Sequence, residues 1–267
     1  MIPNLIVGNW KMNKTPSETE ALLSELMPHL TEAPGTGGRQ VEVVLAPPFT
    51  SLPLAARFLA GTGIALAGQD CHWSEEGPYT GDVSARMLVE VGCRYVILGH
   101  SERRELCGET DHKVNLKAKQ ALFWGLTPII CVGEKIDERE SGRAEMVVER
   151  QVELCLADVA LERGQRLAVA DEPVWAIGSG RTPAPSEVES VHHIIRSELA
   201  SSYGPAVAPL LPILYGGSVT EATIEPMLQL AVVDGVLVGG ASLSAESFLP
   251  LVERARSAVA RPDPPVL

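Results

Sequence analysis

The chain has 267 residues, of which 45% are hydrophobic and only 4% aromatic, so it can bury a large core of mainly aliphatic side chains. Its 22 Lys and Arg residues against 34 Asp and Glu residues give a net charge of −12, which makes nucleic acids and anionic membranes poor partners because both would be repelled. The five cysteines include no C-x-x-C pair, which argues against a disulfide framework or a zinc knuckle. The sequence shows no signal-peptide pattern and no apolar run long enough to span a membrane, so we expect a cytoplasmic protein.

Short β-branched runs recur along the whole chain, and most of them are apolar on both faces. Such runs are typical of buried strands in a parallel sheet that is covered by helices. The eight runs are Leu5–Val7, Val41–Leu45, Ile64–Ala67, Tyr95–Leu98, Pro128–Val132, Leu167–Ala170, Pro212–Tyr215 and Gly235–Val238.

Helical patterns lie between these runs. The segment Thr15-Pro16-Ser17-Glu18 has an N-cap, a proline at the first helical position and a capping-box glutamate. Apolar stripes at helical spacing follow later, at Val148, Val152, Cys155 and Val159 and again at Val188, Val191, Ile195 and Leu199. Eight alternating units predict an α/β fold, a single (β/α)8 TIM barrel domain over residues 1–267. A doubly wound open sheet is the weaker alternative, because no G-x-G-x-x-G follows the first run.

One connection, from Cys71 to Asp82, is too long and polar for a simple barrel loop. Long connections of this kind are either surface excursions or ordered segments with a function. The functional interpretation is an arm that docks on a partner subunit.

Polar residues and glycines follow several of the predicted strands, where barrel enzymes place their active sites. Asn9 and Lys11 follow the first strand, and His100 follows the fourth. Ser218 follows a Gly-Gly pair after the seventh strand, and Gly239-Gly240 follows the eighth. Backbone N–H groups of Ser218, Gly239 and Gly240 are therefore predicted to bind a phosphate, with Lys11 nearby.

Glu172 directly follows the sixth strand, where a buried carboxylate is costly unless it is paired, solvated or functional. We expect it to have a raised pKa and to act as a general base, and the alternative is a salt bridge to Arg103 or Arg104. His100 lies between the fourth strand and a helix that begins near Ser101. The dipole of this helix should keep the His100 imidazole neutral. A structural histidine is the alternative interpretation of His100.

The segment after Glu172 is apolar between a rigid start and a flexible end. Such a segment is typical of a lid that closes over a site and excludes water. Its residues are Pro173, Val174, Trp175, Ala176, Ile177, Gly178, Ser179 and Gly180.

Together these motifs resemble the triosephosphate isomerase family, and the resemblance spans residues 9–243. The matching stretches are Asn9 to Asn13, Gly81 to Ser84, Gly99 to Arg104, Glu172 to Gly178, Tyr215 to Val219 and Val238 to Leu243. The resemblance implies a cofactor-free and metal-free isomerase that interconverts dihydroxyacetone phosphate and D-glyceraldehyde 3-phosphate through an enediol or enediolate.

The resemblance also implies residue roles. Glu172 would move the proton, neutral His100 would polarise the carbonyl, and Lys11, Asn9 and Glu102 would complete the catalytic group. The substrate and its phosphate would be bound by Asn9, Lys11, Gly178, Ser218, Gly239 and Gly240. Tyr215 and Ser218 would latch the closed lid.

A homodimer is implied as well, with the Cys71–Asp82 arm placing Thr80 near the partner subunit's Asn9 and Lys11. The sequence departs from the family pattern at three places: Asp171 stands where a tyrosine is usual, Ser179 replaces a threonine in the lid, and Pro78 replaces an alanine in the arm. Because adjacent strand residues face opposite sides, we expect Asp171 to point away from Glu172. An isomerase of four-carbon sugar phosphates and a non-catalytic phosphosugar-binding protein remain alternatives.

Overall fold

The computed structural model describes residues 4–30 and 41–259. Eight parallel strands form a closed barrel in chain order, which confirms the predicted (β/α)8 fold and shows that the open sheet was the wrong alternative. The ends of the predicted single domain, residues 1 and 267, lie outside the described residues. The strands are β1 (Asn4–Asn9), β2 (Val41–Ala46), β3 (Ala65–Gly68), β4 (Tyr95–Leu98), β5 (Thr127–Val132), β6 (Ala168–Asp171), β7 (Ile213–Tyr215) and β8 (Gly235–Val238).

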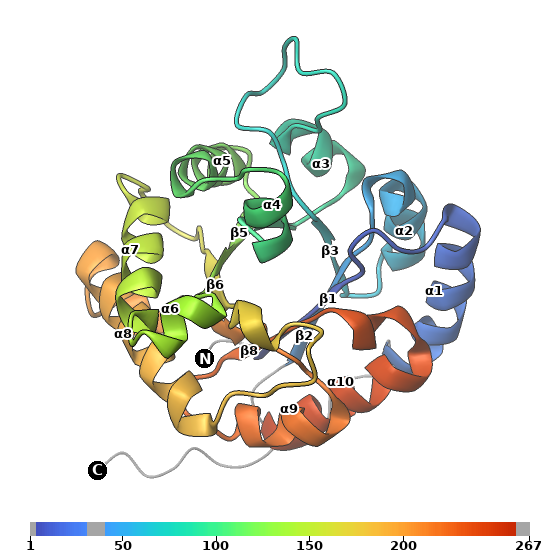
Figure 1. The fold of residues 1–267 in the computed structure, drawn as a ribbon. Coiled ribbons are helices and arrows are strands. Elements are labelled where there is room, and N and C mark those ends of the chain that lie inside the picture. The colour runs from blue at the N-terminus through green and yellow to red at the C-terminus, as the bar shows by residue number, and fades with distance from the viewer. Residues whose placement is uncertain (1–3, 31–40, 260–267) are drawn as a thin grey trace.

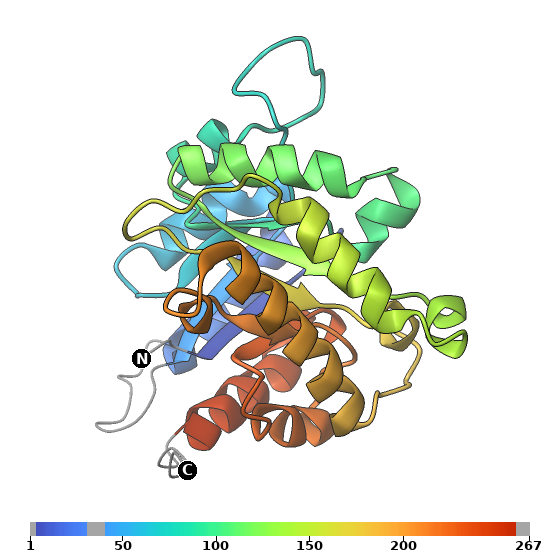
Figure 2. The ribbon, with the colours of Figure 1, turned by 90° about the vertical axis from the view of Figure 1, so that its left-hand side faces the viewer.

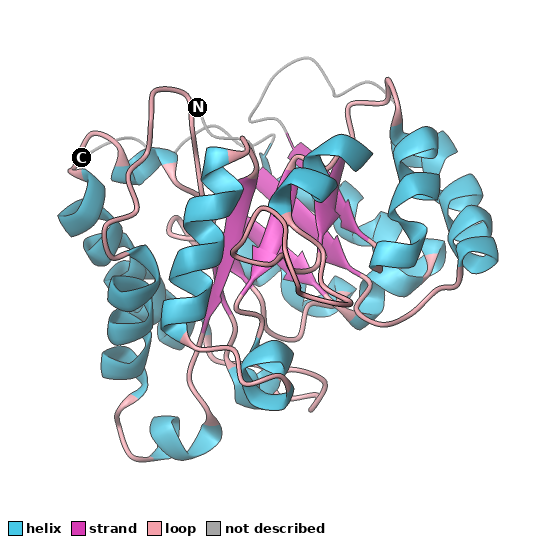
Figure 3. Cartoon of the chain, turned by 90° about the horizontal axis from the view of Figure 1, so that it is seen from above, coloured by secondary structure: helices cyan, strands magenta, loops and turns pink. Residues whose placement is uncertain are grey.

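Helices surround the barrel, as Figure 1 and the view from above in Figure 3 show. They are α1 (Pro16–Leu30), α2 (Leu52–Leu59), α3 (Ala85–Val91), α4 (Ser101–Leu106), α5 (Asp111–Phe123), α6 (Ile136–Glu140), α7 (Ala144–Leu156), α8 (Pro185–Tyr203), α9 (Glu221–Leu228) and α10 (Ala245–Val259). Within the described residues, the short 3-10 helices are η1 (Phe49–Ser51), η2 (Val174–Ala176), η3 (Ala208–Leu210) and η4 (Gly240–Leu243).

Local signals placed the start of α1 correctly. The capping box before α1 is present, because Thr15 N–H donates to Glu18 Oε2 at 2.8 Å and Glu18 N–H donates to Thr15 Oγ1 at 3.4 Å. The predicted stripe through Val159 extends too far, since α7 ends at Leu156. Asp158 has a left-handed φ of 55°, which is incompatible with a continuing helix.

The strand residues alternate between two cores. One face of each strand packs inside the barrel, for example Leu5 and Val7 of β1 and Ala168 and Ala170 of β6. The other face packs against the helices, for example Ile6 and Val169. Because the strands are parallel, this alternation directs Asn9 and Glu172 inward at the same end of the barrel and Asp171 outward.

The connection between β3 and α3 projects from the body of the barrel, as two perpendicular views show (Figures 1 and 2). Its base is closed by a 2.8 Å hydrogen bond from the His72 N–H to the Val83 carbonyl. Within it, the Tyr79 ring stacks on His72 with ring centroids 3.8 Å apart. Thr80 is exposed on this projection. Among the helices of the described residues, none has the length and apolar character needed to cross a bilayer.

Candidate active site

Glu172 and His100 contact each other at the mouth of the barrel, although they are 72 residues apart in the sequence. His100 follows β4 and caps α4, and its Nε2 atom is 3.0 Å from Glu172 Oε1. The other carboxylate oxygen, Glu172 Oε2, accepts the Ser101 N–H at 2.8 Å. Both side chains are buried, and the fold brings together two groups that the sequence placed at strand ends.

The tautomer of His100 follows from its second ring nitrogen. His100 Nδ1 accepts the Glu102 N–H at 3.2 Å, so Nδ1 carries no proton. The neutral ring therefore has its proton on Nε2, and this N–H donates to Glu172. A neutral imidazole with an N–H directed at the barrel mouth is the species predicted from the sequence.

The pKa directions differ from the sequence-based expectation. Burial alone would raise the pKa of the Glu172 carboxyl, but the facing His100 ring, the Ser101 N–H and the Lys11 ammonium lower it below its usual value. Burial would lower the pKa of His100, but the Glu172 carboxylate raises it. The expected raised pKa of Glu172 is therefore wrong for this geometry, because a carboxylate in direct contact with an imidazole is stabilised in its charged form.

Glu172 does not pair with either arginine that was considered as its salt-bridge partner. Arg103 Nη2 lies 2.8 Å from Asp70 Oδ2, and Arg104 Nη1 pairs with Asp111. The alternative interpretation, a salt bridge between Glu172 and Arg103 or Arg104, is therefore wrong.

Lys11 is placed by the turn that ends β1. Its N–H donates to Asn9 Oδ1 at 3.0 Å, and its backbone has a left-handed φ of 53°. The Lys11 ammonium donates to Glu102 Oε1 at 2.6 Å. A Cβ atom added to Gly239 would lie 3.3 Å from Lys11 Cε, so the lysine packs directly over the loop after β8. The Lys11 side chain and backbone are thus contacted by three residues of the predicted site, Asn9, Glu102 and Gly239.

The predicted phosphate-binding residues offer free backbone donors. Ser218 follows β7, Gly239 and Gly240 follow β8, and Gly178 lies in the predicted lid. Within residues 4–30 and 41–259, the N–H groups of these four residues donate to no other protein group. Contacts within these ranges join Gly239 to Lys11 but do not join Gly178 or Ser218 to the other site residues.

The first half of the predicted lid is held by Glu134 and Arg139, to which the sequence analysis assigned no role. Trp175, in η2, donates its indole N–H to Glu134 Oε1 at 2.7 Å, and the Arg139 guanidinium lies 5.2 Å from the centre of its ring. Arg139 also lies 3.1 Å from Glu134 Oε1. At the other end of the lid, Gly178 and Gly180 have φ values of 65° and 74°. The first half is held in place, whereas the glycines provide conformations that other residues rarely adopt.

Gly133 is a further site residue that sequence reasoning gave no role. A Cβ atom there would lie 1.7 Å from the backbone oxygen of Glu172, so only glycine allows β5 and β6 to approach this closely. The only available signal was its position immediately after β5. Its packing partner could not be identified before the barrel was closed.

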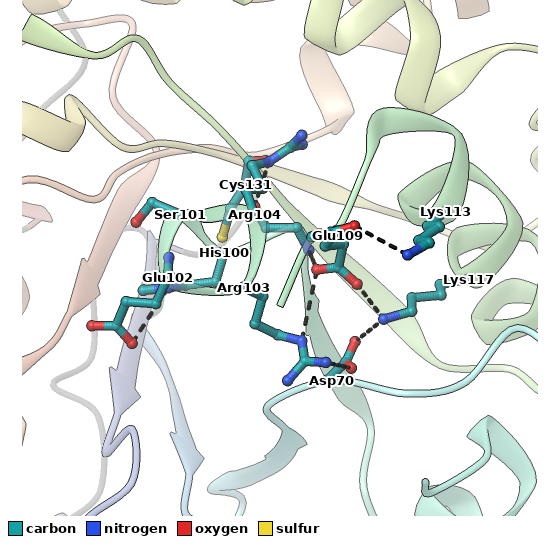
Figure 4. A network of polar contacts seen from close by, with 12 residues as sticks. Asp70, His100, Ser101, Glu102, Arg103, Arg104, Glu109, Lys113, Lys117 and Cys131 are labelled. Atoms are coloured by element: carbon teal, nitrogen blue, oxygen red, sulfur yellow. Dashed lines mark hydrogen bonds and ion pairs between the residues drawn. The ribbon is translucent and has the colours of Figure 1, made fainter. Parts of the chain in front are cut away.

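A buried charged network supports the backbone beside His100 (Figure 4). Glu109 Oε2 accepts the Gly99 N–H at 3.0 Å, and Glu109 Oε1 pairs with the Lys117 ammonium. The same ammonium lies 2.6 Å from Asp70 Oδ1, and the other carboxylate oxygen of Asp70, Oδ2, pairs with Arg103. Lys117 thus links the start of the arm, through Asp70, to the loop that holds His100.

Lys117→Met should destabilise the protein, because it removes the buried cation between Glu109 and Asp70 and, within the described residues, leaves Glu109 with only Arg103 Nε at 3.8 Å as a cation. The expected loss is about 3 kcal/mol of unfolding free energy, typical of removing one partner of a buried ion pair. Urea denaturation would measure it. Lys119→Met, on the same helix, is the matched control, since no ion pair of Lys119 occurs in the described part of the chain. Equal stability of the two variants would show that the network contributes little.

The described residues contain no group of three or more His, Cys, Asp or Glu side chains arranged to hold a metal ion.

Comparisons with known proteins agree on one family. The family model described as triosephosphate isomerase matches residues 4–255. Curated triosephosphate isomerases from Trichlorobacter lovleyi and Pelobacter propionicus are 46% and 48% identical to this chain over 248 residues, which covers 93% of this chain and 97% of each relative. The crystal structure of triosephosphate isomerase from Bartonella henselae superposes with a TM-score of 0.85 at 38% identity, covering 96% of this chain and 100% of that one.

Proposed function

The chain belongs to the triosephosphate isomerase family, and from this premise we propose that it interconverts dihydroxyacetone phosphate and D-glyceraldehyde 3-phosphate. The observation that carries the proposal is the contact between Glu172 and the Nε2 side of a neutral His100, beside the Lys11 ammonium. A base, a neutral hydrogen-bond donor and a cation at one barrel mouth are the groups that an aldose–ketose isomerisation requires.

The proton moves between neighbouring carbons of the substrate. The Glu172 carboxylate removes a proton from C1 of dihydroxyacetone phosphate, and the C–H electrons form the C1–C2 double bond while the carbonyl oxygen gains negative charge. The His100 N–H and the Lys11 ammonium stabilise that oxygen. His100 carries the proton of the C1 hydroxyl to the C2 oxygen, and Glu172 returns its own proton to C2 as the C1 oxygen becomes the aldehyde oxygen. No net redox change or added cofactor is involved.

The His100–Glu172 contact must open for this reaction. A substrate carbonyl oxygen that accepts the His100 N–H takes the place that Glu172 Oε1 occupies at 3.0 Å. The carboxylate then faces a carbon rather than an imidazole, and it loses the main interaction that offsets its burial. Its pKa should rise toward that of an effective base when substrate binds.

The phosphate would be bound by the free N–H groups of Gly178, Ser218, Gly239 and Gly240, with Lys11 supplying positive charge. Gly178 belongs to the lid, so phosphate binding would couple to lid closure over the substrate and exclude water from the enediolate. In the closed state the buried Tyr215 hydroxyl and Ser218 would latch the lid.

The proposal is tested by an assay of the purified protein with dihydroxyacetone phosphate, coupled to oxidation of the aldehyde product. A run in D2O should incorporate solvent deuterium at the carbons that exchange their proton through Glu172. A preference for a tetrulose phosphate would favour the four-carbon alternative, and phosphate binding without turnover would favour the non-catalytic one.

We further propose that the protein is a homodimer formed through the Cys71–Asp82 arm. Large apolar side chains are exposed in the arm, at Tyr79, and in α3 directly after it, at Met87. Met12, in the loop after β1, is also 94% exposed. Exposed apolar groups of this size are typical of interaction surfaces.

Thr80→Glu is expected to weaken the dimer and reduce activity together, because it introduces a charge at the tip of the arm. Sedimentation velocity should show dissociation at a protein concentration where the wild type remains dimeric. Ser202→Glu, which adds the same charge at an exposed position in α8, is the control. An intact and fully active dimer of Thr80→Glu would contradict the proposed interface.

A further inference from the structure

Asp171 and His192 are two fully buried side chains directly behind the proposed base, and the mechanism above uses neither. Asp171 ends β6 immediately before Glu172, and its side chain points outward to α8, as the strand alternation predicts. Asp171 is 1% exposed and His192 is 0% exposed. Asp171 Oδ2 lies 3.5 Å from His192 Nε2, within ion-pair distance, and neither this Nε2 nor Asp171 Oδ1 has a hydrogen-bond partner in the described part of the chain.

The protonation of His192 follows from its other ring nitrogen. His192 Nδ1 lies 3.1 Å from the Val232 carbonyl oxygen, and since a carbonyl only accepts, Nδ1 must carry a proton. Nε2 then faces a carboxylate oxygen. Without a second proton, two lone pairs would oppose each other in a site that excludes water, which is unfavourable. A proton on Nε2 turns this repulsion into an attraction.

The neighbouring charges lead to the same assignment. Glu134 pairs with Arg139 at 3.1 Å, and Asp234 pairs with Arg196 at 2.6 Å, so each of these carboxylates has a cation. Asp171 has no arginine or lysine partner within residues 4–30 and 41–259. The adjacent Tyr215 hydroxyl is buried without a hydrogen-bond partner in the same ranges. Its pKa is raised first by burial and then by the Asp171 charge, so the phenol supplies no charge of its own. His192 is therefore the available counter-ion.

We propose that Asp171 and a doubly protonated His192 form a buried carboxylate–imidazolium pair that positions Glu172. This inference rests on the proposed role of Glu172 as the base. The Asp171 carbonyl accepts the Gly216 N–H at 2.7 Å, and the Glu172 N–H donates to the Val132 carbonyl at 2.7 Å. The pair adds a side-chain connection from this strand end to α8, the helix that follows the lid.

The connection extends further toward the phosphate loop. His192 binds the carbonyl of Val232, which precedes β8, the strand that leads into Gly239 and Gly240. The His192 imidazolium therefore contacts the end of β6, belongs to α8 and binds the segment before β8, the strand that leads to the proposed phosphate-binding residues. Loss of the charge pair should shift the base by a fraction of an ångström without removing any group that touches substrate.

Asp171→Leu is the disrupting variant, because leucine has the same branching at Cγ but carries no charge. We expect kcat to fall about tenfold with KM changed less than about twofold, since small displacements of a reacting group reduce the rate more than binding. Asp171→Asn should recover most of the lost kcat, because its amide N–H can face the unprotonated Nε2 of a neutral His192. His193→Gln, at the exposed neighbouring position on α8, is the control and should retain wild-type kinetics.

Nitrogen-15 NMR of the histidine side chains tests the charge state independently of activity. At pH 7.5 the wild-type His192 ring should show two protonated nitrogens, whereas Asp171→Asn should show a proton on Nδ1 alone. An unprotonated Nε2 in the wild type would overturn the proposed pair, as would an unchanged kcat in folded Asp171→Leu. An inactive wild-type protein with a doubly protonated His192 would instead contradict the proposed function and uphold the pair.

Discussion

Glu172→Gln is expected to lower kcat by about 10³-fold, because the amide cannot accept the substrate proton although it fills the same space. General base catalysis contributes on the order of 10²- to 10⁴-fold, and a residue that both removes and returns the proton belongs in the upper part of that range. Phosphate binding should persist, since its proposed donors are backbone N–H groups of other loops. The expected signature is a large loss of kcat with a small change in KM.

Steady-state kinetics in both reaction directions would measure this loss, because Glu172 removes and returns the proton in each direction and both should be slow. Glu172→Asp should fall between the wild type and Glu172→Gln, since it retains the carboxylate but withdraws it by one methylene. Glu140→Gln, an exposed carboxylate on α6, controls for the change of charge. Turnover of Glu172→Gln near the wild-type value would refute the assigned role.

Lys11→Met should lower kcat/KM by about 10²- to 10³-fold, the range observed when one preorganised electrostatic group is removed from an active site. Two effects combine. The ammonium no longer stabilises the developing enediolate or attracts the phosphate, and Glu102, which the ammonium contacts at 2.6 Å, becomes an unpaired negative charge beside an anionic substrate. Both kcat and KM should therefore deteriorate, unlike in Glu172→Gln.

Inhibition by inorganic phosphate separates the two effects of Lys11. A higher inhibition constant in Lys11→Met would report the lost ground-state attraction, and the remaining loss in kcat would report the transition state. Lys135→Met, at an exposed lysine after β5, is the matched control. Retention of wild-type kcat/KM by Lys11→Met would contradict the placement of Lys11 in the site.

The positions of the candidate site residues could be predicted from the sequence because barrel geometry is repetitive. Once eight strands are recognised, each strand end marks a place at the same rim, so Asn9, His100 and Glu172 become neighbours without any measured distance. The lid was predicted in the same way, from an apolar run between Pro173 and Gly180 that an exposed loop would otherwise not contain, and it stays a prediction.

Charge states and supporting contacts could not be predicted in this way. The sequence suggested a raised pKa for Glu172, but contact with His100 reverses the direction. Lys117 was not singled out, although it joins Asp70 and Glu109 behind the His100 loop. Asp171 was recognised as a departure and expected to point away from the base, but its buried partner His192 was not identified.

The sequence by itself therefore determined the barrel, its order of strands and the residues at its mouth, because strand and helix periods are local properties that each segment carries. Only the tertiary structure decided which charges meet. The contacts of Glu172 with His100, of Lys117 with Asp70 and of Asp171 with His192 join residues that are distant in the chain. Their energies depend on separations of a few ångströms and on burial, which no local pattern encodes.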